Sequence, residues 1–548
     1  MFQLSKLIKS LEDEFIKNDI TESITLRRSS IPSFDLQIDN LVKFQKHKNI
    51  KAIVNSFSKL IENEPLIKNF EVAKNGFINI EINLENYVFE IENIMNALKK
   101  TKKSKKIILD YGGPNIGKPL HVGHLRSLNI GRSLYQINKL AGNNVLNDIH
   151  LGDWGMPVAQ IICYMEINNI DIEKIEIHDL ESIYPKASKQ YLEDNIFNLQ
   201  AQELNKKLNE NQKDVIKKWK KLRSISVESI KETLRILNHS FDLWMGESDV
   251  NNLIPLMLDD LKKDKKISID KGAYVSNFES DPKVLITKSD GSYLYLTTDL
   301  ATVLNRKDKN KIDKTLYIVD KRQKLHFEQL FNSIQYFQFD NGEYTHVEFG
   351  TVNDSNGNPF RTRDGDSKKL NELFEDTLSK IKSINEKLDE ETSKLLANTV
   401  LTFSDLITNR KTDYKFDLDK FTRISGKTGI YVQYAHVRAK KLIQNSNINI
   451  DKVDLATSEM DDTDITLLRA FLKFEYTFSQ ALKNNEPHHL ADYLYELSSV
   501  FNSMYQNVNI LENKNTKLKL NKLKITKHFV NYSKLLMQSL GIQPIEKM

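Results

Sequence analysis

The sequence is short of the residues that stabilise secreted proteins and of the runs that span membranes. Cys163 is its single cysteine, which rules out an internal disulfide and a cysteine-based zinc site. No apolar run reaches the roughly 18 to 20 residues that a membrane-spanning helix requires. The first ten residues, MFQLSKLIKS, are too polar for a secretory signal. These absences predict a soluble, cytoplasmic protein.

A large excess of charge is missing too. The 79 Lys and Arg residues against 74 Asp and Glu leave a net charge of only +5, which excludes a protein that is polycationic over its whole surface. Lysines do gather locally, with six between Lys99 and Lys106 and six between Lys514 and Lys527. Such patches can follow a phosphate backbone. A solvated face, or a linker for the first run, is the simpler interpretation.

What is present indicates three domains in 548 residues. Residues 1–105 mix helical stretches (2–18 and 50–62) with short alternating segments, which predicts a small α/β or α+β module. From Ile107 the pattern alternates strand, helix and strand, which predicts an α/β, Rossmann-like core with a doubly wound parallel sheet over residues 106–370. A charged helical segment at about 170–240 interrupts it. Residues 371–548 lack strand patterns, so we expect an all-helical domain.

Further strands are predicted inside the core. The apolar runs lie at Ala273–Val275, Val284–Ile286, Tyr293–Leu296 and Leu316–Val319. Each of the last two runs directly into a polar turn, and open α/β sheets place their ligands at such turns.

The most informative string is DYGGPNIGKPLHVGHLRS, residues 110–127. A strand, a glycine-bearing turn and a helix form a phosphate site, because unpaired N–H groups at the helix start face an anion. His121 and His124, with Gly123 between them, add two imidazoles that hold nucleotide phosphates as charge builds on the leaving group. We therefore expect ATP here. The alternative is two surface histidines on one helical turn, and a zinc site lacks further ligands nearby.

The full string resembles the first signature of class I aminoacyl-tRNA synthetases, and Pro114, Asn115 and Lys118 make it similar to arginyl-tRNA synthetases. An arginine substrate needs carboxylates for its planar guanidinium. Two strings that match the family, FDLWMGES (241–248) and YLYLTTDLA (293–301), each contain one. The resemblance implies that these acids bind the guanidinium with a tyrosine beside them. The three residues are Glu247, Asp299 and Tyr295, with Asp299 expected at the carboxyl end of a strand.

Other contacts follow from the same resemblance. Asn115 would hold the α-amino or carboxylate group of arginine, and Gln323, in VDKRQKLHFEQLF (319–331), would make the other amino-acid contact. His326 would lie against the adenosine of ATP. A capped helix start is the alternative for these last two residues.

The second class I signature, Lys-Met-Ser-Lys-Ser, is absent from its expected place. Residues 358–370 read NPFRTRDGDSKKL, with Arg361 and Arg363 in the position of the signature lysines. This resembles a subset of arginyl-tRNA synthetases in which a lysine before the first histidine supplies the missing charge, and Lys118 occupies that place. The resemblance assigns these three residues to the ATP phosphates and leaves Lys368 and Lys369 solvated.

The helical tail contains a candidate RNA surface. Residues 421–440, FTRISGKTGIYVQYAHVRAK, resemble the anticodon-side signature of the family, with Lys427 in place of the usual Asn. Its aromatic and hydrogen-bonding side chains suit single-stranded bases, although a helix's core and rim would look similar. The candidate tRNA-binding residues are Tyr431, Gln433, Tyr434 and Arg438. Residues 487–506 resemble the helical anticodon-binding domain.

The resemblance therefore implies a ligase that activates L-arginine with ATP to arginyl-adenylate and pyrophosphate, then transfers arginine to the terminal adenosine of tRNA-Arg. It also implies Mg²⁺ as the ATP counter-ion, no structural zinc, no membrane contact, a monomer, and an N-terminal module that touches the outer corner of the tRNA. A related nucleotidylyltransferase would lack the RNA-binding tail, and an inactive paralogue would lack the site residues. Synthetases for cysteine or glutamine fit less well, because zinc ligands are absent and the paired acids are present.

Overall fold

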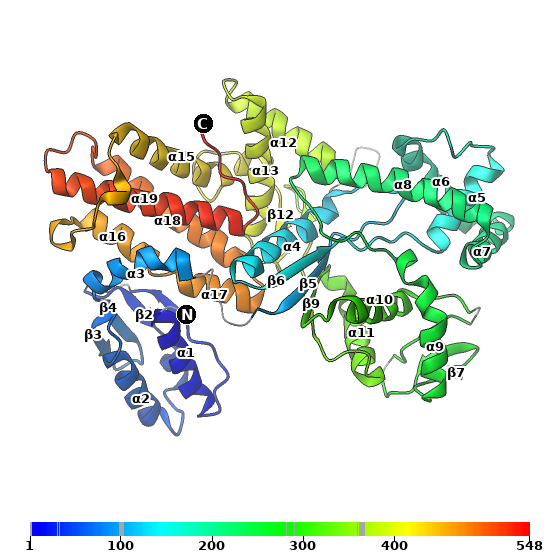
Figure 1. The fold of residues 1–548 in the computed structure, drawn as a ribbon, viewed down its shortest axis with the longest axis horizontal. Helices are drawn as coiled ribbons and strands as arrows, with labels where there is room; N and C mark the ends of the chain where they lie inside the picture. Colours follow the sequence, from blue (N-terminus) through cyan, green and yellow to red (C-terminus); the bar gives the residue numbers. More distant parts are fainter. Residues whose placement is uncertain are drawn as a thin grey trace.

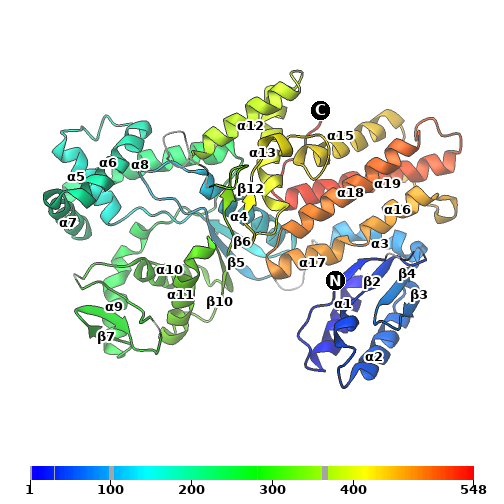
Figure 2. The same cartoon turned by 180° about the vertical axis from the view of Figure 1, so that it is seen from behind.

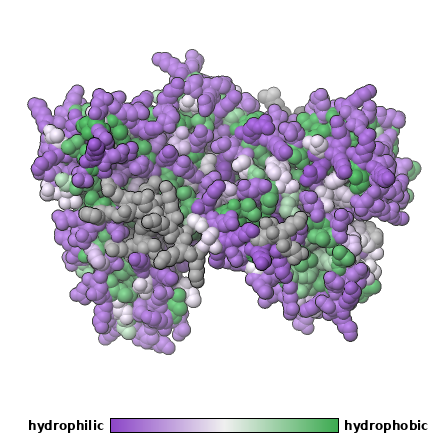
Figure 3. Space-filling view, in the orientation of Figure 1, coloured by the Kyte–Doolittle hydropathy of each residue, from purple (hydrophilic) through white to green (hydrophobic). Residues whose placement is uncertain are grey.

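The computed structural model describes residues 3–29, 31, 33–97, 104–280, 282–289, 291–358, 360 and 368–548. A central parallel sheet lies in the middle of an elongated molecule (Figures 1 and 2). The N-terminal module and the C-terminal helices lie on one side of it, and two lobes lie on the other. Hydrophilic residues dominate the face seen in Figure 3, and hydrophobic ones form small scattered groups. Among the described residues, no helix has the length and apolar character to cross a membrane.

The N-terminal module is an antiparallel sheet, in the order β1-β2-β4-β3, packed against helices. The two helices predicted there are confirmed, and the antiparallel pairing makes the module α+β. Ile78, Ile80 and Ile82 of its central strand are buried in a core with the helices. The elements are α1 (Gln3–Ile16), β1 (Leu26–Arg28), β2 (Leu36–Ile38), η1 (Asn40–Phe44), α2 (Ile50–Glu62), β3 (Ile67–Val72), β4 (Ile78–Ile82) and α3 (Leu84–Ala97).

Four parallel strands form the core sheet in the order β10-β9-β5-β6, which confirms the predicted parallel α/β core. Along the chain, β5 is followed first by β6, its neighbour on one side in the sheet. Only after the insertion does the chain form β9, its neighbour on the other side. The strand order therefore reverses between β5 and β9, and such a switch point leaves a crevice at the strands' carboxyl ends. The strands are β5 (Lys106–Tyr111), β6 (Asn144–Asp148), β9 (Lys314–Ile318) and β10 (Glu343–His346).

Helix α4 (Val122–Leu140) joins β5 to β6 and is buried on almost every face. Its apolar face, with Leu128, Ile130, Leu134 and Ile137, belongs to the main core. Gly131 lets it approach the sheet closely, because a Cβ there would lie 2.2 Å from the ring of Tyr111. The helix is thus a fixed central element.

Two of the predicted core strands are wrong. Tyr293–Leu296 runs into helix α10 (Tyr295–Asn310), because Leu296, Leu300 and Val303 recur at helical spacing and are buried on one face. Val284–Ile286 forms only a bridge, between Leu285 and Val275. A third prediction holds as a strand, β8 (Ala273–Ser276), but it pairs antiparallel with β7 (Ile267–Asp270) outside the core sheet.

The two lobes each have a hydrophobic core of their own. The helical insertion predicted at about 170–240 is confirmed and also packs against α5. Its elements are α5 (Met156–Ile167), α6 (Ile177–Glu193), α7 (Asn195–Asn209) and α8 (Lys213–Ile236). The other lobe contains η3 (Glu247–Asp249), η4 (Asn251–Leu253), α9 (Ile254–Lys263), α10, η5 (Lys321–Gln323) and α11 (Lys324–Phe337) with the β7–β8 hairpin.

The remainder of the described chain is helical apart from a two-residue pairing between β11 (Val352–Asn353) and β12 (Tyr414–Lys415), as expected. Its helices share the main core with α4 and the N-terminal module. They are α12 (Leu370–Ile384), α13 (Glu390–Leu406), α14 (Leu418–Phe421), α15 (Gly429–Ser446), η6 (Ile450–Lys452), η7 (Thr457–Glu459), α16 (Asp462–Phe471), α17 (Phe474–Asn484), α18 (His488–Asn507) and α19 (Thr516–Ser539).

Candidate active site

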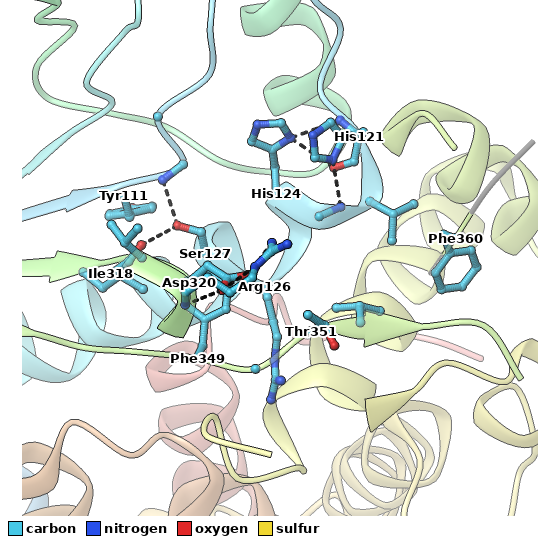
Figure 4. Close-up of a pocket in the computed structure, with 18 of the residues that line it drawn as sticks. Tyr111, His121, His124, Arg126, Ser127, Ile318, Asp320, Phe349, Thr351 and Phe360 are labelled. Carbon is cyan, nitrogen blue, oxygen red and sulfur yellow. Dashed lines mark hydrogen bonds and ion pairs between the residues drawn. The ribbon is translucent and has the colours of Figure 1, made fainter. Parts of the chain in front are cut away.

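A first cavity of about 560 Å³ lies at the switch point of the sheet. Asp110 and Tyr111 at the end of β5, and Ile318 to Asp320 at the end of β9, form its floor, and the start of α4 forms one wall. Figure 4 shows the side chains from these elements around a common space. His121, Gly123 and His124 all line it, so the structure brings the predicted phosphate residues together at a helix N-terminus.

The two histidines cap the helix whose start they occupy. The backbone N–H of His121 donates to Nδ1 of His124 at 3.1 Å, and the N–H of Gly123 donates to Nδ1 of His121 at 3.1 Å. A backbone N–H can only donate, so Nδ1 of each ring accepts and Nε2 carries the proton. Each imidazole therefore keeps one N–H donor free of the cap.

Both imidazoles are neutral at physiological pH. Burial lowers the pKa of His124 to about 3, and burial followed by the nearby Lys118 lowers the pKa of His121. A neutral pair of Nε2–H groups stabilises growing negative charge by hydrogen bonding rather than by its own charge. The formal positive charge near the phosphates must then come from elsewhere.

Lys118 lies close enough to His121 to lower its pKa, and its ammonium lies over the ring of Tyr184 in the insertion at 4.1 Å. The described cations that line the first cavity are Arg126 and Arg322. Arg361 and Arg363 lie outside the described residues. The segments on either side of them do border the first cavity: Phe360 lines it, and Lys369 forms a β-bridge with His121. Lys369, expected to be solvated, is partly exposed and its ammonium is paired with Glu181 at 2.6 Å.

A second cavity of about 180 Å³ contains Glu247 and Tyr295. Glu247 begins η3, and its partly buried carboxylate accepts a hydrogen bond from the backbone N–H of Trp154. Burial, with the nearby Asp299 and Asp153 adding to it, raises the pKa of Glu247 to about 8. The nearby imidazolium of His150 offsets this rise only in part, and a guanidinium in the cavity would pair with the ionised carboxylate directly.

Asp299 occupies the second turn of α10 and not the end of a strand, for the reason given above. Its carboxylate lies 2.6 Å from Nε2 of His326, so the residue expected at the guanidinium and the residue expected at the adenosine are in direct contact. Tyr295, at the start of α10, is 63% exposed, and burial followed by Glu247 raises the pKa of its phenol. Tyr295 is therefore not a core side chain.

The remaining predicted amino-acid contacts lie on turns. Asn115 is exposed and forms a parallel bridge with Gly152, and a Cβ at Gly152 would meet Oδ1 of Asn115 at 2.0 Å. The turn after β5 therefore depends on a glycine in the turn after β6. Gln323 is exposed and ends the short η5 segment before α11. Neither residue lines the first or second cavity.

Asp153 is a residue whose role the sequence does not suggest. It lies in the LGDWG turn (151–155), and its carboxylate accepts the N–H and Oγ–H of Ser248 at 2.9 and 2.8 Å and Nε–H of Arg223 at 2.6 Å. It thus ties the turn that carries Glu247 to α8. The partners of Asp153 lie 70 and 95 residues away in the sequence, so no local pattern indicates them.

Arg306 of α10 is a second such residue. Its guanidinium donates to the carboxylates of Asp110 and Asp148 at 2.6 Å each, joining the ends of β5 and β6 beneath the first cavity. All three side chains are buried. This buried cation between two acids, with His150 also beside Asp148 at 3.8 Å, fixes the floor of the cavity, because neither acid can turn away without losing a partner.

On the helical side, three of the four predicted RNA-binding residues share a groove of about 430 Å³ between α15 and α18. The guanidinium of Arg438 lies over the rings of Tyr434 and Tyr505 at 4.3 and 4.7 Å, and Tyr431 also lines the groove. Gln433 is different: it is fully buried and its amide hydrogen-bonds to Thr399, Gln543 and Ile545. It holds the C-terminal segment, which corrects its prediction as an RNA contact.

The second lysine run, between Lys514 and Lys527, does not form an exposed basic surface of unpaired lysines. Lys522 and Lys524 are buried, with Lys522 paired to Asp461 and Asp464, while Lys517 and Lys527 are paired to acids. Most of the first run, from Lys99 to Lys103, lies outside the described residues. These runs therefore give no support to an extended phosphate-tracking surface.

Three sequence families match successive parts of the chain. Residues 3–82 match the family described as arginyl tRNA synthetase N terminal domain, residues 90–418 the class I tRNA synthetase (R) catalytic domain, and residues 432–548 the DALR anticodon binding domain. The three matches follow the order of the N-terminal module, the core and the helical region.

Whole proteins match as well. The chain is 34% identical over 505 residues to the arginine–tRNA ligase of Agathobacter rectalis, covering 84% of each chain. It is 32% identical over 540 residues to that of Francisella tularensis subsp. novicida, covering 93% of this chain and 92% of that one. The crystal structure of arginyl-tRNA synthetase from Plasmodium falciparum superposes with a TM-score of 0.81 at 26% identity, over 99% of both chains.

Proposed function

The chain belongs to the arginyl-tRNA synthetase family, and we propose how its own residues divide that family's reaction. The reaction has two steps: ATP and L-arginine give arginyl-adenylate and pyrophosphate, and arginine is then joined to tRNA. The observation that carries our assignment is the pairing of two sites in one core. Neutral N–H donors at a helix start line one cavity, and a partly buried carboxyl group whose pKa is raised to about 8 lines the other.

In the first step an oxygen of the arginine carboxylate attacks the α-phosphorus of ATP, and the bond to the β-phosphate breaks to release pyrophosphate. His121, Gly123 and His124 hold the phosphates through Nε2–H groups and the N-terminus of α4. Lys118, Arg361 and Arg363 supply positive charge, and Mg²⁺ accompanies ATP as its counter-ion. His326 lies on the adenosine side, where its contact with Asp299 joins the two substrates' sites.

Arginine is held by its two ends. Glu247 accepts the guanidinium, with Asp299 and Tyr295 beside it, and Asn115 and Gln323 hold the α-amino and carboxylate groups.

In the second step the 2′-hydroxyl of the terminal adenosine attacks the carbonyl carbon of the adenylate, and AMP leaves. Tyr431, Tyr434 and Arg438 contact single-stranded bases of the tRNA by stacking. We place the domain limits at 1–105, 106–370 and 371–548, and propose a cytoplasmic monomer without structural zinc.

The direct test is arginine-dependent exchange of pyrophosphate into ATP by the full chain, with and without tRNA-Arg. We expect exchange with arginine and none with lysine or glutamine, because a neutral amide or a single ammonium leaves acceptors of the site unsatisfied. Exchange that is equal for arginine and lysine would contradict the guanidinium site. Absence of exchange even with tRNA would contradict the activity.

His124→Ala should slow adenylate formation by roughly 10²- to 10³-fold, as expected when one preorganised donor to the developing charge is lost. The KM for arginine should change by less than about twofold, since the ring does not line the second cavity. Single-turnover formation of adenylate measures this. His124→Asn keeps an acceptor for the His121 N–H, so it separates the capping role from the catalytic one. Full activity of that variant would mean that the ring of His124 only caps the helix. His178→Ala, at an exposed histidine of α6, is the control.

A further inference from the structure

The second cavity contains two amide oxygens that the protein leaves without donors. Oδ1 of Asn251 and Oδ1 of Asn205 are buried, and neither has a hydrogen-bond partner in the described part of the chain. Both residues line the cavity beside Glu247 and Tyr295, and Asn251 is only 8% exposed. An acceptor that loses its water without gaining a donor is unfavourable. Such atoms therefore indicate a donor that arrives with a ligand.

The two asparagines reach the cavity from the two different lobes. Asn251 begins η4, four residues after Glu247, and this segment packs against α10. Asn205 lies in α7 of the helical insertion, one turn before Asn209. Asn209 anchors that helix to the active-site turn, because its Oδ1 accepts the indole N–H of Trp154 at 2.9 Å. The insertion is thereby held where Asn205 can contribute to the cavity wall.

The number of donors on a guanidinium matches what these atoms can accept. Arginine's side chain carries five N–H groups, and one bidentate carboxylate accepts two of them. Glu247 is the acid that lines the cavity, and the other predicted acid, Asp299, is engaged with His326 at 2.6 Å. Three N–H groups then need neutral acceptors. The other charged residue among the described lining residues is Lys288, which is exposed.

We propose that Asn251 and Asn205 are specificity-determining residues of the arginine pocket, whose Oδ1 atoms accept guanidinium N–H groups that Glu247 leaves free. This inference rests on the proposed function, because it takes Glu247 as the partner of the guanidinium. It gives the helical insertion a part in selecting the amino acid. An analogue with too few N–H donors leaves both oxygens unsatisfied, which is the strongest form of discrimination available to a polar pocket.

The test uses Asn251→Ala and Asn205→Ala in the full chain, with arginine-dependent pyrophosphate exchange measured in the presence of tRNA. Each variant should raise the KM for arginine by roughly 10- to 100-fold, the effect of a lost hydrogen bond to a charged group. The kcat and the KM for ATP should stay within about twofold. Asn205→Asp keeps an acceptor oxygen and should return the KM for arginine close to that of the unchanged chain.

Asn198→Ala is the matched control, since Asn198 belongs to the same helix and its amide donates to the carbonyl of Tyr191, away from the cavity. Its kinetics should not change. A wild-type KM for arginine in both cavity variants would overturn the inference and leave the proposed function intact. Equal changes in kcat and in the KM for ATP, together with a lower melting temperature, would also overturn it by showing a structural role. Absence of exchange by the unchanged chain would overturn the proposed function itself.

Discussion

Replacing Glu247 with glutamine is expected to lower kcat/KM for arginine by roughly 10²- to 10³-fold. Glutamine keeps the size of the side chain and an oxygen that accepts the Trp154 N–H, so the change removes the negative charge alone. Breaking one side of a buried charge pair costs about 3–5 kcal/mol, and each 1.4 kcal/mol corresponds to tenfold. Steady-state exchange at varied arginine measures the loss, while the KM for ATP should remain close to wild type.

The matched control is Asp249→Asn, two residues further along the same 3-10 turn. Asp249 is exposed and its carboxylate accepts the N–H of Gly246 at 2.9 Å, so its amide variant makes the same chemical change outside the cavity. It should leave the KM for arginine unchanged. Similar losses in both variants would mean that the turn, and not the Glu247 charge, determines arginine binding.

The pH dependence of arginine binding provides a second readout of the same group. Burial raises the pKa of Glu247 to about 8, so the free protein holds it protonated below that pH, and arginine binds the ionised form. The sign follows: the KM for arginine should fall by about tenfold per unit as pH rises toward 8, then level off. Glu247→Gln should abolish this slope. A flat profile in the unchanged chain would contradict the raised pKa.

The sequence was sufficient wherever the determining signal is local. The strand, turn and helix around His121 to His124 lie within residues 107–141, and the structure has them there. The alternating run at 293–296 misled, because four residues cannot distinguish a strand from the first turn of a helix until Leu300 and Val303 are included. For that reason alone, Asp299 is predicted at the end of a strand but lies in a helix.

Contacts between residues far apart in the chain could not be predicted from the sequence. From the sequence, Asp153 is an ordinary turn residue, because its partners Arg223 and Ser248 are close only in the folded chain. Gln433 lies in a motif that resembles an RNA-binding one, but its amide hydrogen-bonds to the C-terminal segment. The polar face of α4 is a further case. Nothing local in the sequence indicates that Arg126 of this helix meets an acid 279 residues away.

Arg126→Met is expected to lower the free energy of unfolding by about 3–5 kcal/mol. The guanidinium is 1% exposed and donates to Asp405 at 3.0 Å and to the carbonyl of Asn409 at 3.1 Å, with the ring of Tyr414 at 5.0 Å. Removing it leaves Asp405 buried with only the amide of Asn129 as a donor that the described contacts provide. Denaturant unfolding followed by tryptophan fluorescence and circular dichroism measures the loss.

The double variant Arg126→Met with Asp405→Leu decides whether the loss comes from the unpaired acid. Replacing both partners of a buried pair with apolar groups is often nearly neutral, so the double variant should recover most of the stability that the single variant loses. Arg235→Met, at an exposed arginine of α8, should stay within about 0.5 kcal/mol. Because Arg126 also lines the first cavity, the single variant should slow adenylate formation at temperatures where it is folded. If the double variant is no more stable than the single one, Arg126 stabilises the helix through its carbonyl contacts, and the acid is not the reason for its burial.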